Sequence, residues 1–214
     1  MNKTVVVVVG TILAFALPGC SREAPQPEVA PQSETPAPAV AEQEGEIRPI
    51  PMDYEEPVVG GAKLLAGDDI FSSLTRSGDH KLMVRAIRHV GLEEIFGGNG
   101  PITVFAPTDA AFRRIPGGFE RLLEPANEQE LISLLSYHVV PERLDDHAFA
   151  QKVLAGNDQA QLATVQGGTI KATVGDGAAI LVDQSGAVAK LTVPNVLQSN
   201  GVLQVIDKVL LPAK

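Results

Sequence analysis

The order of hydrophobic patterns constrains the fold of this chain more than any other feature of its sequence. Between residues 67 and 136, apolar residues recur mainly at helical spacing, with one short β-like run at residues 102–105. From residue 137 onward, the chain consists mostly of β-branched runs separated by turn residues. Helices that precede strands, rather than alternate with them, indicate an α+β domain and not a parallel βαβ sheet.

Polar residues mark where the predicted helices begin. The candidate caps are Asp69, Asp79, Thr108 or Asp109, and Asn127. Glu130, three residues after Asn127, completes a pattern like a capping box. Gly91 is expected to end the second helix.

The predicted strands alternate with clear turn signals. They cover residues 137–140, 162–165, 169–174, 180–182, 188–192 and 202–210. Gly167-Gly168 and Asp176-Gly177 are typical hairpin turns, and Asn200-Gly201 is predicted to be a turn that uses positive φ angles.

The N-terminus carries the features of an export signal. One cation, Lys3, precedes a short apolar stretch that is too short to cross a bilayer as a helix, and Cys20 follows it. This arrangement resembles a bacterial lipoprotein signal, which implies a signal peptide over residues 1–19 and a lipid anchor on Cys20. Pro18 departs from that pattern, so an ordinary secretory signal or an uncleaved anchor stays open. The residue after the cysteine is Ser21 rather than aspartate, which in Gram-negative lipoproteins would favour the outer membrane.

Residues 20–66 differ in composition from the rest of the chain. They are rich in proline, alanine and glutamate, and their acidic residues outnumber their basic ones. Such a segment buries too little apolar surface to offset the entropy of ordering it. We therefore expect an acidic, disordered tether here. Because Cys20 is the only cysteine, the domain at residues 67–214 has no internal disulfide and depends on its hydrophobic core.

Three motifs in this domain carry a family resemblance. The stretch from Thr103 to Phe112 resembles the first signature of fasciclin domains, Tyr137-His138 resembles their central motif, and residues 200–212 are similar to the closing signature. The resemblance implies a fasciclin-like fold in which N-terminal helices pack on a β-strand wedge or sandwich. It also implies adhesion or interaction rather than catalysis.

Residues of the central and closing motifs limit what the resemblance implies about a binding site. Tyr137 and His138 belong to a region that is linked to receptor adhesion in animal members of the family. Here His138 follows a leucine-rich helix stripe, so we expect it to be buried and to support the fold by hydrogen bonding. Gln204 stands where the closing signature usually has histidine, which argues against transferring animal receptor contacts to this chain.

The residues indicate no catalytic, metal or cofactor site. The chain has no Gly-x-Ser-x-Gly elbow and no zinc-binding His-Glu-x-x-His helix. The cluster at residues 145–147 contains two aspartates and a histidine, but a helix cap with a solvated face is the more common role of such a cluster. A net charge of −9 and the lack of tryptophan argue against nucleic-acid binding.

These observations favour a membrane-anchored module of the bacterial cell envelope. We expect it to be lipid-anchored, non-catalytic, periplasmic or surface-exposed, and to contact an envelope or extracellular protein or polysaccharide. Two alternatives stay open: a structural envelope component without a specific partner, and a small-ligand binder or enzyme with an unrecognised site.

Overall fold

The computed structural model of the chain describes residues 51, 53–175 and 178–213. Cys20, the predicted signal peptide and most of the predicted tether lie outside these residues. Within the described part, no helix is long and apolar enough to span a bilayer.

The predicted α+β class is confirmed. The helices are α1 (Ile70–Arg76), α2 (Lys81–His89), α3 (Glu93–Gly97), α4 (Asp109–Phe112), α5 (Phe119–Leu122), α6 (Glu128–Tyr137) and α7 (Asp146–Ala155), with a short 3₁₀ helix at Pro125–Asn127. The strands are β1 (Val58–Val59), β2 (Ala62–Lys63), β3 (Ile102–Pro107), β4 (Val139–Val140), β5 (Gln159–Ala163), β6 (Thr169–Gly175), β7 (Ala178–Val182), β8 (Val188–Gln198) and β9 (Gly201–Ile206).

The main sheet has seven strands in the order β4-β3-β9-β8-β7-β6-β5. Adjacent strands of this sheet are antiparallel, except for β3 and β9, which run parallel to each other. Just beyond β5, the Val165 N–H donates to the Val139 carbonyl of β4 over 2.8 Å. The two ends of the sheet are therefore linked, which agrees with the wedge or sandwich that the family resemblance implies.

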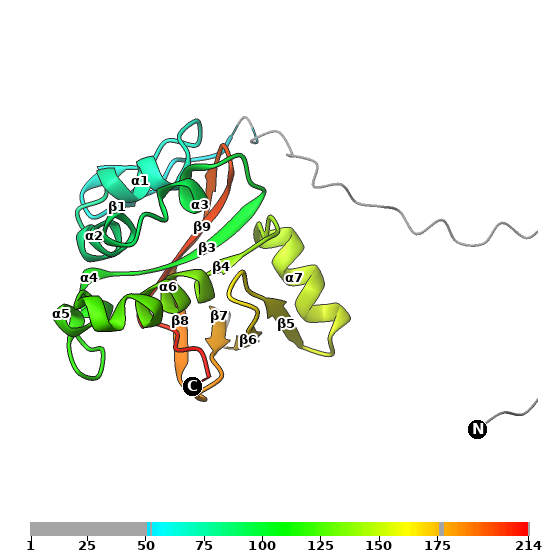
Figure 1. Cartoon of the computed structure of the whole chain (residues 1–214). Helices are drawn as coiled ribbons and strands as arrows, with labels where there is room; N and C mark the ends of the chain where they lie inside the picture. Colours follow the sequence, from blue (N-terminus) through cyan, green and yellow to red (C-terminus); the bar gives the residue numbers. More distant parts are fainter. Residues whose placement is uncertain (1–50, 52, 176–177, 214) are drawn as a thin grey trace, which may run out of the picture. The chain divides into compact units, whose positions relative to one another are not determined.

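Strands β3 and β9 separate two hydrophobic cores. Val104 and Leu203 face a core built with the helices, whereas Phe105 and Ile206 face a core built with strands β5 to β8 and α7. Because side chains alternate along a strand, both faces of these two strands are buried, which is usual for a parallel pair. Figure 1 shows α1, α2 and α3 on the opposite side of β3 and β9 from strands β5, β6 and β7.

The domain begins earlier than its predicted start at Gly67. Strands β1 and β2 form a hairpin, and Val59 and Leu64 are buried in the helical core. Tyr54 is hydrogen-bonded to β8. The assignment of residues 54–66 to a disordered tether is therefore wrong. The hairpin strands are too short to show a β pattern in the sequence. The prolines and acidic residues around them gave the segment the composition of a disordered tether.

Some helix caps differ from the prediction. Of the two predicted candidates, Thr108 and Asp109, Thr108 caps α4 by accepting from the Ala111 N–H. The predicted cap of α2, Asp79, does not act there; instead Asp109 accepts the Leu82 N–H over 2.8 Å from a different element. Likewise, Asn127 makes no capping bond to α6.

Candidate functional site

Tyr137 and His138 lie where α6 ends and β4 begins. The apolar stripe of α6 includes Leu131, Leu134 and Leu135, which face the helical core. Tyr137 was predicted to start a strand, but it is the last residue of α6, and His138 is the C-cap. Both side chains are buried, with exposed fractions of 0% and 1%. The structure thus places the two residues side by side inside the domain.

Two backbone groups hold the His138 ring. The Leu210 N–H donates to Nε2 over 3.0 Å, so this nitrogen carries no proton. Nδ1 then carries the proton and donates to the Leu134 carbonyl over 2.8 Å. Burial lowers the pKa of His138 from 6.5 to about 4, although the Leu134 carbonyl and Asp183 act in the opposite direction. The ring is therefore neutral at physiological pH and joins α6 to the C-terminal segment.

The Tyr137 hydroxyl joins two further segments. It donates to the Thr169 carbonyl at the start of β6 over 2.8 Å and accepts from the Gln184 N–H over 3.3 Å. Burial raises the pKa of Tyr137, because the phenolate would lose its hydration. The hydroxyl therefore serves as a hydrogen-bonding bridge and not as an acid or base near neutral pH.

Asp183, in the turn between β7 and β8, completes this arrangement. Its Oδ1 accepts the backbone N–H groups of Ser185 and Ala187, each over 2.9 Å, while its Oδ2 accepts the Leu211 N–H over 2.8 Å. The first two bonds close the β7–β8 turn, and the third holds the C-terminal segment. We call Tyr137, His138 and Asp183 the polar anchor. Only the Asp-x-Ser-Gly turn pattern could have indicated Asp183 from the sequence.

An apolar groove of about 980 Å³ lies beside the polar anchor. Leu122 and Leu134 contribute from α5 and α6, and the β7–β8 turn and the C-terminal segment that the anchor holds supply further lining. The full lining is Ile115, Pro116, Gly117, Arg121, Leu122, Glu130, Leu134, Gln184, Ser185, Leu211, Pro212 and Ala213. The sequence did not reveal this groove, because its walls come from segments far apart in the chain.

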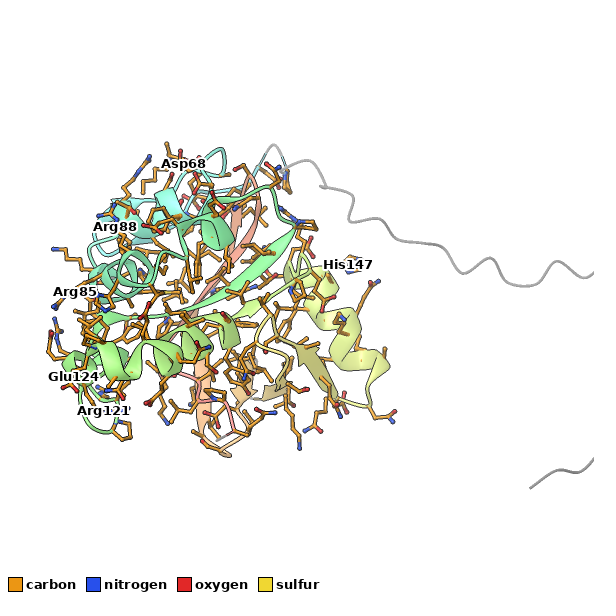
Figure 2. The ribbon with its side chains drawn as sticks, viewed as in Figure 1. Asp68, Arg85, Arg88, Arg121, Glu124 and His147 are labelled. Atoms are coloured by element: carbon orange, nitrogen blue, oxygen red, sulfur yellow. The ribbon has the colours of Figure 1, made fainter. Side chains whose placement is uncertain are left out.

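Charged side chains at the groove pair with each other. Arg121 forms a two-pronged ion pair with Glu130, with N–O distances of 2.9 and 2.6 Å. Figure 2 shows Arg121 and Glu124 at the end of the domain that carries α5. The groove thus offers mainly apolar surface with a neutralised ion pair in its lining.

A second polar cluster, which we call the bulge cluster, surrounds an irregular stretch of β8. Asn195 adopts a φ of 55° there, within the register shift between Val193 and Val196. The Tyr54 hydroxyl donates to the Asn195 carbonyl over 3.2 Å and accepts from the Leu197 N–H over 2.8 Å. Gln204, at the position where the sequence departs from the fasciclin signature, accepts the Asn195 N–H over 2.8 Å and donates to the Leu144 carbonyl. The amide therefore has a structural role in this chain.

The described residues contain no group of three or more His, Cys, Asp or Glu side chains that could hold a metal ion. In the cluster at residues 145–147, Asp145 caps α7 by accepting the Ala148 N–H over 2.8 Å. His147 lies exposed on the same helix. Cys20, the predicted lipidation site, lies outside the described residues.

A family model for the fasciclin domain matches residues 78–212. The chain is 35% identical over 151 residues to Protein sll1483 of Synechocystis sp., over 70% of this chain and 72% of that protein. It is 31% identical over 149 residues to transforming growth factor-beta-induced protein ig-h3 of Sus scrofa, over 70% of this chain but only 19% of that relative. A solved FAS1 domain pair from the insect cell adhesion molecule fasciclin I is similar with a TM-score of 0.60 and 15% identity, over 67% of this chain and 51% of that one.

Proposed function

The chain belongs to the fasciclin domain family, and we propose that it acts as a non-catalytic adhesion or interaction module of a bacterial cell envelope. Fasciclin domains are associated with cell adhesion and extracellular interactions. The proposal extends this association to a protein or polysaccharide partner in the envelope or outside the cell.

The burial of the polar anchor is the observation that carries this proposal. Within the family motifs, His138 and Tyr137 carry side chains that could act as an acid or a base. Their polar atoms are instead hydrogen-bonded to backbone groups inside the domain. A neutral, enclosed imidazole has no access to a substrate. Partner contacts must therefore use the outer surface that the anchor holds in place.

We further propose that a lipid on Cys20 holds the domain at the membrane. Two or more acyl chains are sufficient for stable anchoring, because each buried methylene contributes about 0.8 kcal/mol. The acidic, proline-rich residues 21–50 would then separate the domain from the membrane. The support for this part is the sequence pattern of residues 1–20, and Ser21 favours the outer membrane.

Crosslinking in living cells tests the proposed function. The full chain and its Cys20→Ala variant would be expressed at equal levels, and the captured adducts identified. A discrete adduct that depends on Cys20 is expected. No specific adduct from a folded, membrane-bound chain would contradict the proposal and favour a structural envelope component.

The apolar groove supports a second candidate, a binder of small apolar ligands. Its volume and its largely apolar lining fall within the range of ligand-binding clefts. A metabolite screen by thermal shift tests this candidate, with Ser185→Trp as the variant that fills the groove. A shift that occurs in the wild type and disappears in Ser185→Trp would support it, and no shift in the wild type would exclude it.

A further inference from the structure

Strands β5 to β8 present one face that no element of the described domain covers. The printed strand pairings align two rows of side chains across this face: Gln161, Lys171, Val182 and Val188 in one row, and Gln159, Thr173, Ile180 and Lys190 in the other. We call these eight residues the outer sheet face. They are all exposed or half-buried.

The opposite face of the same strands shows why the outer one is free. The row Ala160, Ala172, Leu181 and Ala189 is buried, with exposed fractions of 4% or less. Phe149 and Val153 of α7 belong to the core on that side. Since side chains alternate along each strand, the domain uses one face for its core and leaves the other to solvent.

The charge of the outer sheet face is opposite to that of the chain. The chain carries a net charge of −9, yet this face has two lysines and no acidic residue. Neither Lys171 nor Lys190 forms an ion pair with another described residue. At one edge, Asp207 accepts the backbone N–H of Lys190 over 2.7 Å, so one of its carboxylate oxygens is directed to the β8 backbone. The face therefore suits an acidic partner.

The uncharged side chains of the outer sheet face indicate which class of acidic partner it suits. Two glutamines and a threonine offer hydrogen bonds suited to hydroxyl groups, and three aliphatic side chains offer apolar contact between them. The face has no aromatic residue, methionine or arginine, which are the residues enriched where proteins bind proteins. The two lysine Cα atoms lie about 12 Å apart by ordinary sheet spacing, so one extended polymer can reach both.

We propose that the outer sheet face binds a carboxylated polysaccharide through Lys171 and Lys190. This proposal rests on the proposed interaction function and names its surface and its partner class. The lysines contact carboxylates, the amide and hydroxyl side chains contact sugar hydroxyls, and the aliphatic side chains pack against the C–H faces of the sugars.

Binding of the full chain to alginate, a carboxylated polysaccharide, tests the proposal by biolayer interferometry. Neutral dextran of similar length is the comparison ligand. The wild type is expected to bind alginate and not dextran, and Lys171→Glu/Lys190→Glu is expected to weaken alginate binding at least about tenfold. The matched control, Lys81→Glu/Arg114→Glu, makes the same change in net charge at two exposed positions outside this face. It should stay within about twofold of the wild type.

Three results would overturn the proposal: no alginate binding by the wild type, an equal loss in both double variants, or equally tight binding of polyglutamate. The melting temperatures of both variants should stay near that of the wild type, because all four positions are exposed.

The cell crosslinking experiment is independent of this surface. If alginate does not bind while a Cys20-dependent adduct persists, the binding role proposed for the outer sheet face is wrong and the proposed interaction function stands.

Discussion

Tyr137 and Tyr54, the only two tyrosines in the chain, make the same pair of hydrogen bonds in different surroundings. Each hydroxyl donates to one backbone carbonyl and accepts from one backbone N–H. Tyr137 does so while completely buried, in the polar anchor between the two halves of the domain. Tyr54 does so half-buried, in the bulge cluster at the N-terminal edge of the domain.

The burial of a polar group, rather than the number of its hydrogen bonds, decides how much it contributes to the stability of the domain. A buried carbonyl or N–H that loses its partner keeps the full cost of desolvation, whereas an accessible one can turn to water. The polar anchor should therefore control the stability of the whole domain. The bulge cluster should mainly fasten the segment around Tyr54.

The largest effect is expected from His138→Ala. The variant removes the partners of two buried backbone groups and leaves a cavity, so we expect a loss of about 3 kcal/mol in the free energy of unfolding. For a domain of this size, that corresponds to a melting temperature lower by roughly 6–12 °C. Calorimetry measures the change. An unchanged melting temperature would mean that the imidazole does not support the fold.

The pH dependence of stability also tests whether His138 supports the fold. In the unfolded chain His138 binds a proton near its ordinary pKa of 6.5, whereas in the folded chain burial lowers its pKa to about 4. Stability is therefore present above pH 6.5, falls as the pH drops from 6.5 to 4, and levels off below that, with a loss on the order of 3 kcal/mol. Burial also lowers the pKa of His80, which acts in the same direction.

Urea unfolding at several pH values between 4 and 7 measures this dependence. The side chain of His138→Gln does not titrate, so the free energy of unfolding of this variant should depend less steeply on pH than that of the wild type. The part of the dependence that is due to His80 should remain. An equal pH dependence in the two proteins would show that His138 does not contribute to it.

A smaller effect is expected from Tyr137→Phe, which keeps the ring and removes only the hydroxyl. The Thr169 carbonyl and the Gln184 N–H lose their partner inside the domain, so the expected loss is about 1–3 kcal/mol. The change is measured as a shift in the urea midpoint without a change in slope.

The smallest effect is expected from Tyr54→Phe, the matched variant of the bulge cluster. Water can replace part of the lost bonding at this half-buried site, so the expected loss is about 0.5–1 kcal/mol. Hydrogen exchange should become faster at the Leu197 N–H, which loses its acceptor, and stay unchanged in the polar anchor. If this variant costs as much as Tyr137→Phe, the distinction between the two clusters is wrong.

The parts of the fold that follow from local pattern were predictable. Alternating residues predicted β6 to within one residue and the last three residues of β7, and Thr108, one of two candidate caps, is the cap of its helix. His138 was expected to be buried because it follows an apolar helix stripe, and the structure places it there. These features depend on a few neighbouring residues, which a sequence displays directly.

The rest depends on contacts between distant segments. Asp109 caps α2 across the fold, and Asp183 reaches the C-terminal segment, so neither role leaves a local pattern. Gly201 was predicted for a positive φ angle, but its φ is not positive. It is needed because a Cβ would collide with the Ile102 carbonyl of the paired strand. The neighbouring Asn200 bonds to Ile70, Phe96 and Gly98, which no turn pattern indicates.

The protonation state of His138 tests the central claim, that the family motif supports the fold while the outer surface makes the contacts. Long-range proton–nitrogen NMR correlations of the ring, recorded from pH 7 downward, report both the state and the position of the proton. We predict a neutral ring with its proton on Nδ1 down to about pH 4. A ring that titrates near pH 6.5, or that carries its proton on Nε2, would contradict the account, because it would be open to solvent or differently bonded.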